Sequence, residues 1–135
     1  MPEAKVSMQV RLVNGIAGII DIQGELTAFA EQLLTRTYEA ASLRGTRAIL
    51  LNFSEMEYMN SSGIGLIVTL LIRTNRQKQQ LFAYGLSDHY QHIFQLTRLN
   101  DAIQIYPSES EAIKALKTVA KIAETPAKPR FLGRK

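Results

Sequence analysis

The chain has 135 residues, a length that fits one domain with a single hydrophobic core. It contains no cysteine, which excludes disulfides and cysteine-ligated metal centres, and no apolar run approaches the roughly 20 residues that cross a bilayer. The formal net charge of +4 is accounted for by the last ten residues, so the body is near neutral and an extended nucleic-acid surface is not expected.

The first two predicted elements form a hairpin. Apolar and polar side chains alternate over residues 6–12, as in a half-buried strand, and a second strand is predicted over residues 16–23. Asn14-Gly15 between them is a strong signal for a tight turn, and Gly24-Glu25 is expected to end the second strand.

A helix is predicted next, with Thr27 as its N-cap and Gly45 just beyond its end. Its apolar residues recur at helical spacing and are expected to face inward: Phe29, Leu33, Leu34, Tyr38 and Ala41. Residues 47–53 then form a continuous apolar run, which is typical of a strand covered on both faces. From Glu57 we expect a loop, which leads into a helix ending near Gln77.

The last predicted elements are a strand over 81–84, a helix over 88–97, a strand over 103–106 and a helix that begins at the capping box 108–111. This helix is expected to turn Ile113, Leu116, Val119 and Ala120 inward. The order is β-β-α-β-α-β-α-β-α, which indicates an α/β domain with a mixed sheet over residues 1–124 and a basic, flexible tail over 125–135. Right-handed crossovers place the loop around Ser61 at the carboxyl end of the third strand, where sites form in such sheets.

The segment Asn60-Ser61-Ser62-Gly63 lies between a buried strand and a helix. Helix starts accept anions, so a phosphate on Ser61 would be well placed, and it would add about −1.5 to −2 charges to the surface. The alternative is that this serine only caps a helix, as serines often do.

Apolar residues occupy nearly every side of the first turns of this helix. They are Ile64, Leu66, Ile67, Val68, Leu70, Leu71 and Ile72. A surface helix needs one apolar stripe, so either this helix is unusually buried or part of it faces a partner protein.

Several segments in this order resemble the STAS family of anti-sigma factor antagonists. They are residues 22–26 (IQGEL), 51–54 (LNFS), 59–65 (MNSSGIG), 93–97 (IFQLT) and 111–116 (EAIKAL). The resemblance covers residues 5–118, and the segment SSGIG after an apolar strand is its most specific part.

The resemblance implies a bacterial partner switch in transcription regulation. The unmodified antagonist binds an anti-sigma factor that is also a serine kinase, the kinase phosphorylates a serine with ATP, and a phosphatase reverses the reaction. By position the acceptor here is Ser61, with the partner-binding surface formed by Glu25, Thr27, Asn60, Ser62, Gly63, Ile64, Leu66 and Ile67.

Two residues depart from the family pattern. The aspartate that precedes the acceptor serine is Asn60 here, and the last residue of the Gly-Glu-Leu-Asp pattern is Thr27. Both changes remove negative charge from loops that lie close together in the family fold. They favour an alternative in which the chain is a non-phosphorylated adaptor or structural subunit of a signalling or transport assembly.

The remaining motifs do not predict catalysis. His89 and His92 are too few for a metal site, and the types Ser61, His92 and Asp101 lack the Gly-x-Ser-x-Gly elbow of a hydrolase. No cofactor fingerprint is present, so we expect no enzyme activity and no cofactor. The N-terminus lacks the apolar stretch of a secretory signal, which favours a cytoplasmic protein without membrane insertion. The sequence does not indicate an oligomeric state.

Overall fold

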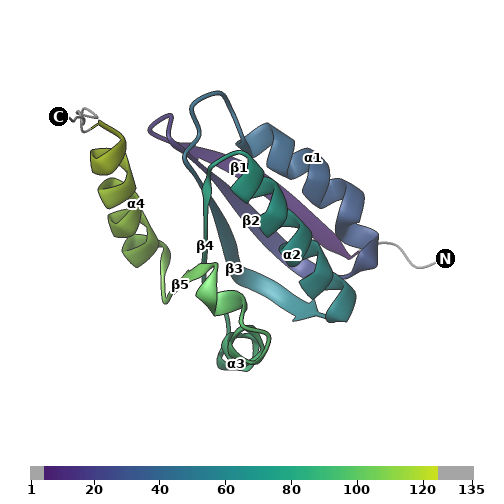
Figure 1. Ribbon diagram of the computed structural model, residues 1–135. Helices are drawn as coiled ribbons and strands as arrows, with labels where there is room; N and C mark the ends of the chain where they lie inside the picture. Colours follow the sequence, from purple (N-terminus) through teal and green to yellow (C-terminus); the bar gives the residue numbers. More distant parts are fainter. Residues whose placement is uncertain (1–4, 125–135) are drawn as a thin grey trace.

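A computed structural model describes residues 5–124, and five strands form one mixed sheet in the order β1-β2-β3-β4-β5 (Figure 1). The strands are β1 (Val6–Val13), β2 (Ala17–Leu26), β3 (Ala48–Met59), β4 (Gln80–Tyr84) and β5 (Gln104–Tyr106). Strand β1 is antiparallel to β2, and every other pair is parallel. The predicted α/β fold and its element order are therefore confirmed.

The turn between β1 and β2 is the one that the sequence predicts. Asn14 and Gly15 both have positive φ, 51° and 70°. Two consecutive residues of this kind give a turn whose twist matches that of the flanking strands, which is why Asn-Gly is favoured there.

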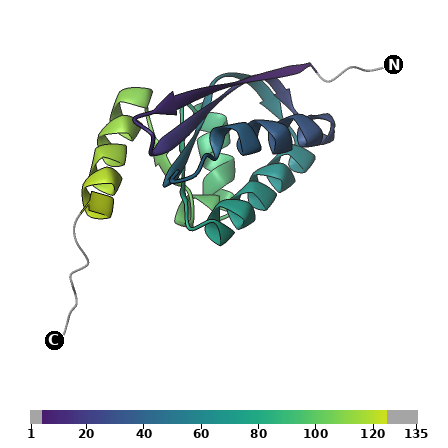
Figure 2. The same ribbon diagram turned by 90° about the horizontal axis from the view of Figure 1, so that it is seen from above.

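The helices cover the two faces of the sheet unequally. They are η1 (Ala28–Ala30), α1 (Glu31–Ala41), α2 (Ser61–Arg76), α3 (Asp88–Leu96), η2 (Leu99–Asp101) and α4 (Glu109–Glu124). Helices α1 and α2 lie side by side on one face, and α4 lies apart from them toward the other face and the β5 edge (Figures 1 and 2). The main core joins α1, α2 and α3 to the first face, and a smaller core joins α4 to the second.

Strand β3 supplies side chains to both cores. Ile49 and Leu51 belong to the main core, Ala48 and Leu50 belong to the smaller one, and all four are fully buried. The prediction of a strand covered on both faces is confirmed. Burial on both faces fixes the position of β3 within the sheet, and therefore the position at which α2 begins.

A charged network ties the start of α4 to the second face of the sheet. The guanidinium of Arg11 donates to both carboxylate oxygens of Asp21 at 2.7 and 2.8 Å and to Glu109 at 2.7 Å. The Tyr84 hydroxyl donates to the same Glu109 carboxylate at 2.6 Å. The hydrogen bonds from Arg11 lower the pKa of Asp21 and of Glu109.

Helix α4 packs as predicted where its side chains are described. Ala112 and Leu116 are buried and Ile113 is half-buried against the smaller core. The Glu111 N–H donates to the Ser108 hydroxyl at 3.3 Å, which is one half of the predicted capping box. Val119, Ala120 and the predicted basic tail lie outside the residues whose side chains are described.

Three sequence-based predictions are wrong in detail. Phe29 was expected to face inward but is 65% exposed, because residues 28–30 form a 3-10 turn that precedes α1 and changes the helical phase. Residues 57–59 were expected in a loop but belong to β3, and β2 continues past Gly24-Glu25 to Leu26. The two strands extend each other by pairing Glu25 with Tyr58 and Leu26 with Met59.

Candidate functional site

The start of α2 meets the ends of β2 and β3 at the carboxyl edge of the sheet. The Leu26 carbonyl accepts a hydrogen bond from the Asn60 N–H at 3.4 Å, so Thr27 and Asn60 lie on neighbouring chain segments. A Cβ atom at Gly63 would collide with the Leu26 carbonyl oxygen. Glycine at this position therefore permits the close approach that brings the two predicted loops together.

Asn60 is the N-cap of α2. Its side-chain oxygen accepts a hydrogen bond from the Gly63 N–H at 3.0 Å, and its backbone is extended, with φ −103° and ψ −174°. The cap is therefore Asn60 and not Ser61, the residue considered above as a possible cap. Asparagine satisfies the helix start without adding a charge.

Ser61 is the first residue of α2, and its side chain is exposed. Asn60 provides the cap, and the Ser61 hydroxyl makes no hydrogen bond within residues 5–116, whose side chains the structure describes. A hydroxyl without a structural role, placed on the surface at the positive end of a helix, is open to modification.

Tyr90 braces the strand end that leads to Ser61. Its hydroxyl oxygen on α3 accepts a hydrogen bond from the Met59 N–H at 2.9 Å, and its side chain is only 8% exposed. The sequence gives no signal for this contact between residues 31 positions apart.

Ser61 begins a row of exposed residues along one side of α2, here called the α2 outer stripe. The stripe consists of Ser61, Gly65, Val68 and Ile72, whose spacing of four, seven and eleven residues puts them on one side of the helix. All four are exposed, Val68 to 38% and Ile72 to 48%. Phe29 on η1, an element that packs against α2, is a further exposed apolar side chain at this end of the domain.

The apolar residues of α2 thus divide between core and surface. Ile67 and Leu70 are buried in the main core, and Ile64, Leu66 and Leu71 are half-buried against it. The helix is therefore not buried on every side, and the contact of its exposed part with a partner protein stays a prediction.

Two residues predicted to bind a partner are not available on this surface. Ile67 is fully buried because it lies on the side of α2 that faces the sheet, and Gly63 is buried against Leu26. The exposed apolar side chains of this helix are instead Val68 and Ile72, which follow Ile67 by one and five positions and therefore face another side. Ser62 is exposed. Glu25, Thr27 and Asn60 are half-buried, and these three are here called the rim residues.

The end of the domain around Ser61 is acidic. The segments that meet there, residues 23–31, 53–65 and 86–92, contain no lysine or arginine, and Lys5, whose carbonyl accepts a hydrogen bond from the Glu25 N–H, adds one cation beside them. They carry Glu25, Glu31, Glu55, Glu57 and Asp88. The expected loss of charge at Asn60 and Thr27 therefore does not leave this end without carboxylates.

The histidines and the set Ser61, His92 and Asp101, which the sequence does not predict to form a site, have the following surroundings in the structure. Within residues 5–124, no group of three or more His, Cys, Asp or Glu side chains could hold a metal ion. Asp101 forms an ion pair with Arg98 at 2.7 Å, and no hydrogen bond joins it to His92 or Ser61. No helix in the described part of the chain has both the length and the apolar character needed to cross a membrane.

Comparison with known proteins bears on the family and the fold of the chain. The family model described as STAS domain matches residues 7–112. An anti-sigma-B factor antagonist of Staphylococcus aureus (strain NCTC 8325 / PS 47) is 30% identical over 86 residues, which are 64% of this chain and 80% of the relative.

Solved structures have the same fold. An anti-sigma factor antagonist from Mycobacterium paratuberculosis superposes with a TM-score of 0.71 at 16% identity, over 83% of this chain and 94% of the other. The phosphorylated form of the Bacillus cell fate determinant SpoIIAA superposes with a TM-score of 0.64 at 23% identity, over 82% and 99% of the two chains. At these identities the likeness shows the fold alone.

Proposed function

Because the chain belongs to the STAS domain family of anti-sigma factor antagonists, which are regulators and not enzymes, we propose that it binds an anti-sigma factor with serine kinase activity through the surface around Ser61. Phosphorylation of Ser61 by that kinase ends the interaction, and a phosphatase restores it. The proposed setting is the bacterial cytoplasm.

The observation that carries this proposal is the position of Ser61. Its hydroxyl is exposed and does not cap α2, because Asn60 is the N-cap. Ser61 is also the first residue of the α2 outer stripe, which ends at Ile72. Exposed apolar side chains next to a modifiable hydroxyl supply both affinity and control. The proposed contact residues are the α2 outer stripe together with Phe29, Ser62 and the rim residues Glu25, Thr27 and Asn60.

The expected effect of phosphate on Ser61 is electrostatic. It would place about −1.5 to −2 charges at the start of the α2 outer stripe, at the end of the domain that also carries Glu25 and Glu57. A partner that covers the stripe would have to desolvate that charge, which is costly without a cation to pair it. The modification therefore opposes docking even where it leaves the fold of the domain unchanged.

A binding experiment tests the proposal. The chain and its Ser61→Asp variant are each used to capture proteins from an extract of the source cells, and bound proteins are identified by mass spectrometry. We expect the unmodified chain to recover an anti-sigma factor with an ATP-binding kinase domain, and the variant to recover much less of it. The purified kinase should then transfer phosphate from ATP to the chain at Ser61.

The control is Ser61→Ala, which should bind but accept no phosphate. Equal recovery of the kinase by the Ser61→Asp variant, or phosphate transfer to Ser62 in place of Ser61, would contradict the proposed control. Recovery of no such kinase by any form would contradict the proposed partner.

A second candidate function is a non-phosphorylated adaptor within a larger assembly. The observation in its favour is that Asn60 and Thr27 occupy the places of the two family aspartates, so a kinase that reads those carboxylates lacks them here. Intact mass measurement of the chain from its own cells across growth conditions separates the two functions, because only the switch requires a phosphorylated population.

A further inference from the structure

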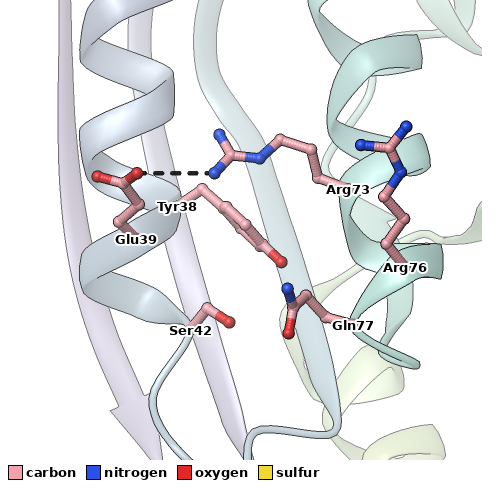
Figure 3. Close-up of a pocket in the computed structure, with 6 residues that line it drawn as sticks. All are labelled: Tyr38, Glu39, Ser42, Arg73, Arg76 and Gln77. Atoms are coloured by element: carbon pink, nitrogen blue, oxygen red, sulfur yellow. Dashed lines mark ion pairs between the residues drawn. The ribbon is translucent and has the colours of Figure 1, made fainter.

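A polar cavity lies between the C-terminal ends of α1 and α2, at the far end of α2 from Ser61 (Figure 3). Its volume is about 320 Å³, and it is lined by Tyr38, Glu39, Ser42, Arg73, Arg76 and Gln77. At about 1.5 Å per residue, the arginines lie roughly 20 Å along the helix from the proposed phosphorylation site. The cavity is therefore separate from the surface assigned to the partner.

A buried hydrogen-bond chain fixes one side of the cavity. The Tyr38 hydroxyl donates to the side-chain oxygen of Gln79 at 2.8 Å, and the Gln79 amide nitrogen donates to the Ser42 hydroxyl oxygen at 2.6 Å. Tyr38 and Gln79 are 3% and 7% exposed. Because Ser42 uses an oxygen lone pair for Gln79, its own O–H proton remains available to a ligand.

The opposite side is formed by two guanidinium groups of α2. Figure 3 shows Arg73 extended across from α2 to α1, where its guanidinium lies 4.9 Å from the centre of the Tyr38 ring and 3.6 Å from Glu39. Arg76 makes no ion pair with any residue in the described range. Stacking on Tyr38 holds Arg73 in place without using its hydrogen-bonding edge fully.

The lining has many hydrogen-bond donors and few negatively charged groups. Arg73, Arg76 and Ser42 can all donate hydrogen bonds into the cavity, and Gln77 adds an amide, while Glu39 supplies the one carboxylate. Arg73 and Glu39 nearly cancel each other, so Arg76 leaves the cavity with a positive charge.

The surroundings strengthen this field. The segments that form this end of the domain, residues 39–47 and 73–80, meet where the Gln80 N–H donates to the Arg47 carbonyl at 2.9 Å. They contain one acidic residue, Glu39, and five cationic residues: Arg44, Arg47, Arg73, Arg76 and Lys78. The basic end lies opposite the acidic end around Ser61, so an anion is drawn to the cavity and away from the partner surface.

We propose that this cavity is a binding site for a compact multivalent oxyanion, a small phosphorylated or polycarboxylate molecule. The size of the cavity is at the lower end of the range for small-molecule sites, which fits a compact ligand. The one aromatic face in the lining, Tyr38, is already covered by Arg73, so recognition depends on charge and hydrogen bonds and not on stacking. Paired guanidiniums match the planar forks of phosphate and carboxylate groups.

The test is a titration of the full chain, labelled with ¹⁵N, with pyrophosphate and separately with citrate at constant ionic strength. We expect saturable shifts of the backbone amides within residues 38–42 and 73–79 for at least one probe. A preference for pyrophosphate identifies a phosphorylated ligand, and a preference for citrate identifies a polycarboxylate. Arg76→Gln should weaken binding about tenfold or more, because it removes a charge-assisted donor, and Arg76→Lys should weaken it less.

The matched control is Arg98→Gln, which removes an exposed arginine that is already paired with Asp101 outside the cavity. It should leave the affinity unchanged. The proposal is overturned if neither probe saturates the shifts below about 10 mM, if Arg98→Gln weakens binding as much as Arg76→Gln does, or if the shifts spread over cationic residues throughout the chain. The measurement needs no partner protein, so its outcome is independent of the function proposed for Ser61.

Discussion

The Met59 N–H donates a hydrogen bond to the Tyr90 hydroxyl oxygen at 2.9 Å, which joins the last residue of β3 to α3 two positions before Ser61. This buried contact holds the strand end that presents the proposed phosphorylation site. The site is therefore supported by a helix that lies on the other side of the loop, and not only by the two strands that lead to it.

Removing the Tyr90 hydroxyl should destabilise the domain. In Tyr90→Phe the Met59 N–H loses its acceptor while the ring remains packed, and we expect the free energy of unfolding to fall by about 1–2 kcal/mol. Denaturant unfolding followed by circular dichroism measures this. The matched control is Tyr58→Phe, since Tyr58 is 48% exposed. An equal loss of stability in both variants would assign no special role to the contact.

The cap at Asn60 should tolerate aspartate but not alanine. Asn60→Ala removes the acceptor of the Gly63 N–H, and we expect it to cost about 1 kcal/mol of stability. Asn60→Asp keeps the acceptor and adds a charge at the positive end of α2, so its stability should equal or exceed that of the native chain.

The same unfolding measurement on Ser61→Ala provides the comparison, because the Ser61 hydroxyl takes no part in the cap. We expect its stability to remain within about 0.5 kcal/mol of the native value. A loss as large as that of Asn60→Ala would mean that the hydroxyl of Ser61 is structural, which would weaken the case for its modification.

The sequence predicts the fold well where local signals are strong. Asn14-Gly15 fixes the hairpin, the apolar run 47–53 identifies a strand buried on both faces, and α2 is predicted to within one residue of its observed end at Arg76. The site segment 60–63 is also predictable, because consecutive residues carry the signals for the end of a buried strand and the start of a helix.

The details that shape the site depend on contacts between distant residues. Residues 54–59 alternate poorly, so only their pairing with β2 shows that they form a strand. The exposure of Phe29 follows from a 3-10 turn, and that of Val68 and Ile72 from the way α2 is rotated on the sheet. Apolar pattern alone does not distinguish which side of an apolar helix is covered. For this reason the partner-binding set predicted from the sequence includes the buried Ile67 and omits the exposed Val68.

The α2 outer stripe should contribute to partner binding without contributing to stability. We expect Val68→Ser and Ile72→Ser each to weaken binding of the proposed anti-sigma factor by about 1–3 kcal/mol, because each removes exposed apolar area that the partner would cover. Their unfolding free energies should change by no more than about 0.5 kcal/mol. Calorimetric titration against the captured partner measures the affinity.

Leu12→Ser is the matched control for this experiment. Leu12 is 54% exposed, but it lies on β1 opposite Gly18, toward the end of the hairpin remote from the start of α2. It should leave the affinity unchanged. If the stripe variants bind with native affinity while the Ser61→Asp variant does not, the partner contacts the rim residues around Ser61 and not the exposed apolar side chains of α2.

The charged network at the start of α4 should make stability depend on pH in the acidic range. Because Arg11 lowers the pKa of Asp21 and Glu109 in the folded chain, their contribution is fully present above the unfolded values, about 3.9 and 4.3, and is lost as the pH falls through the folded values. We expect Arg11→Gln to cost about 1–2 kcal/mol at pH 6, a figure reduced for the partial exposure of the network. The cost should shrink toward pH 2, where the native chain has also lost these ion pairs.

Unfolding of both proteins by denaturant at pH 6, 4 and 2 measures this cost. Arg98→Gln, which breaks a solvent-exposed pair, should cost little at every pH. A cost for Arg11→Gln that stays constant with pH would mean that packing of the Arg11 stem, and not its charge, anchors α4.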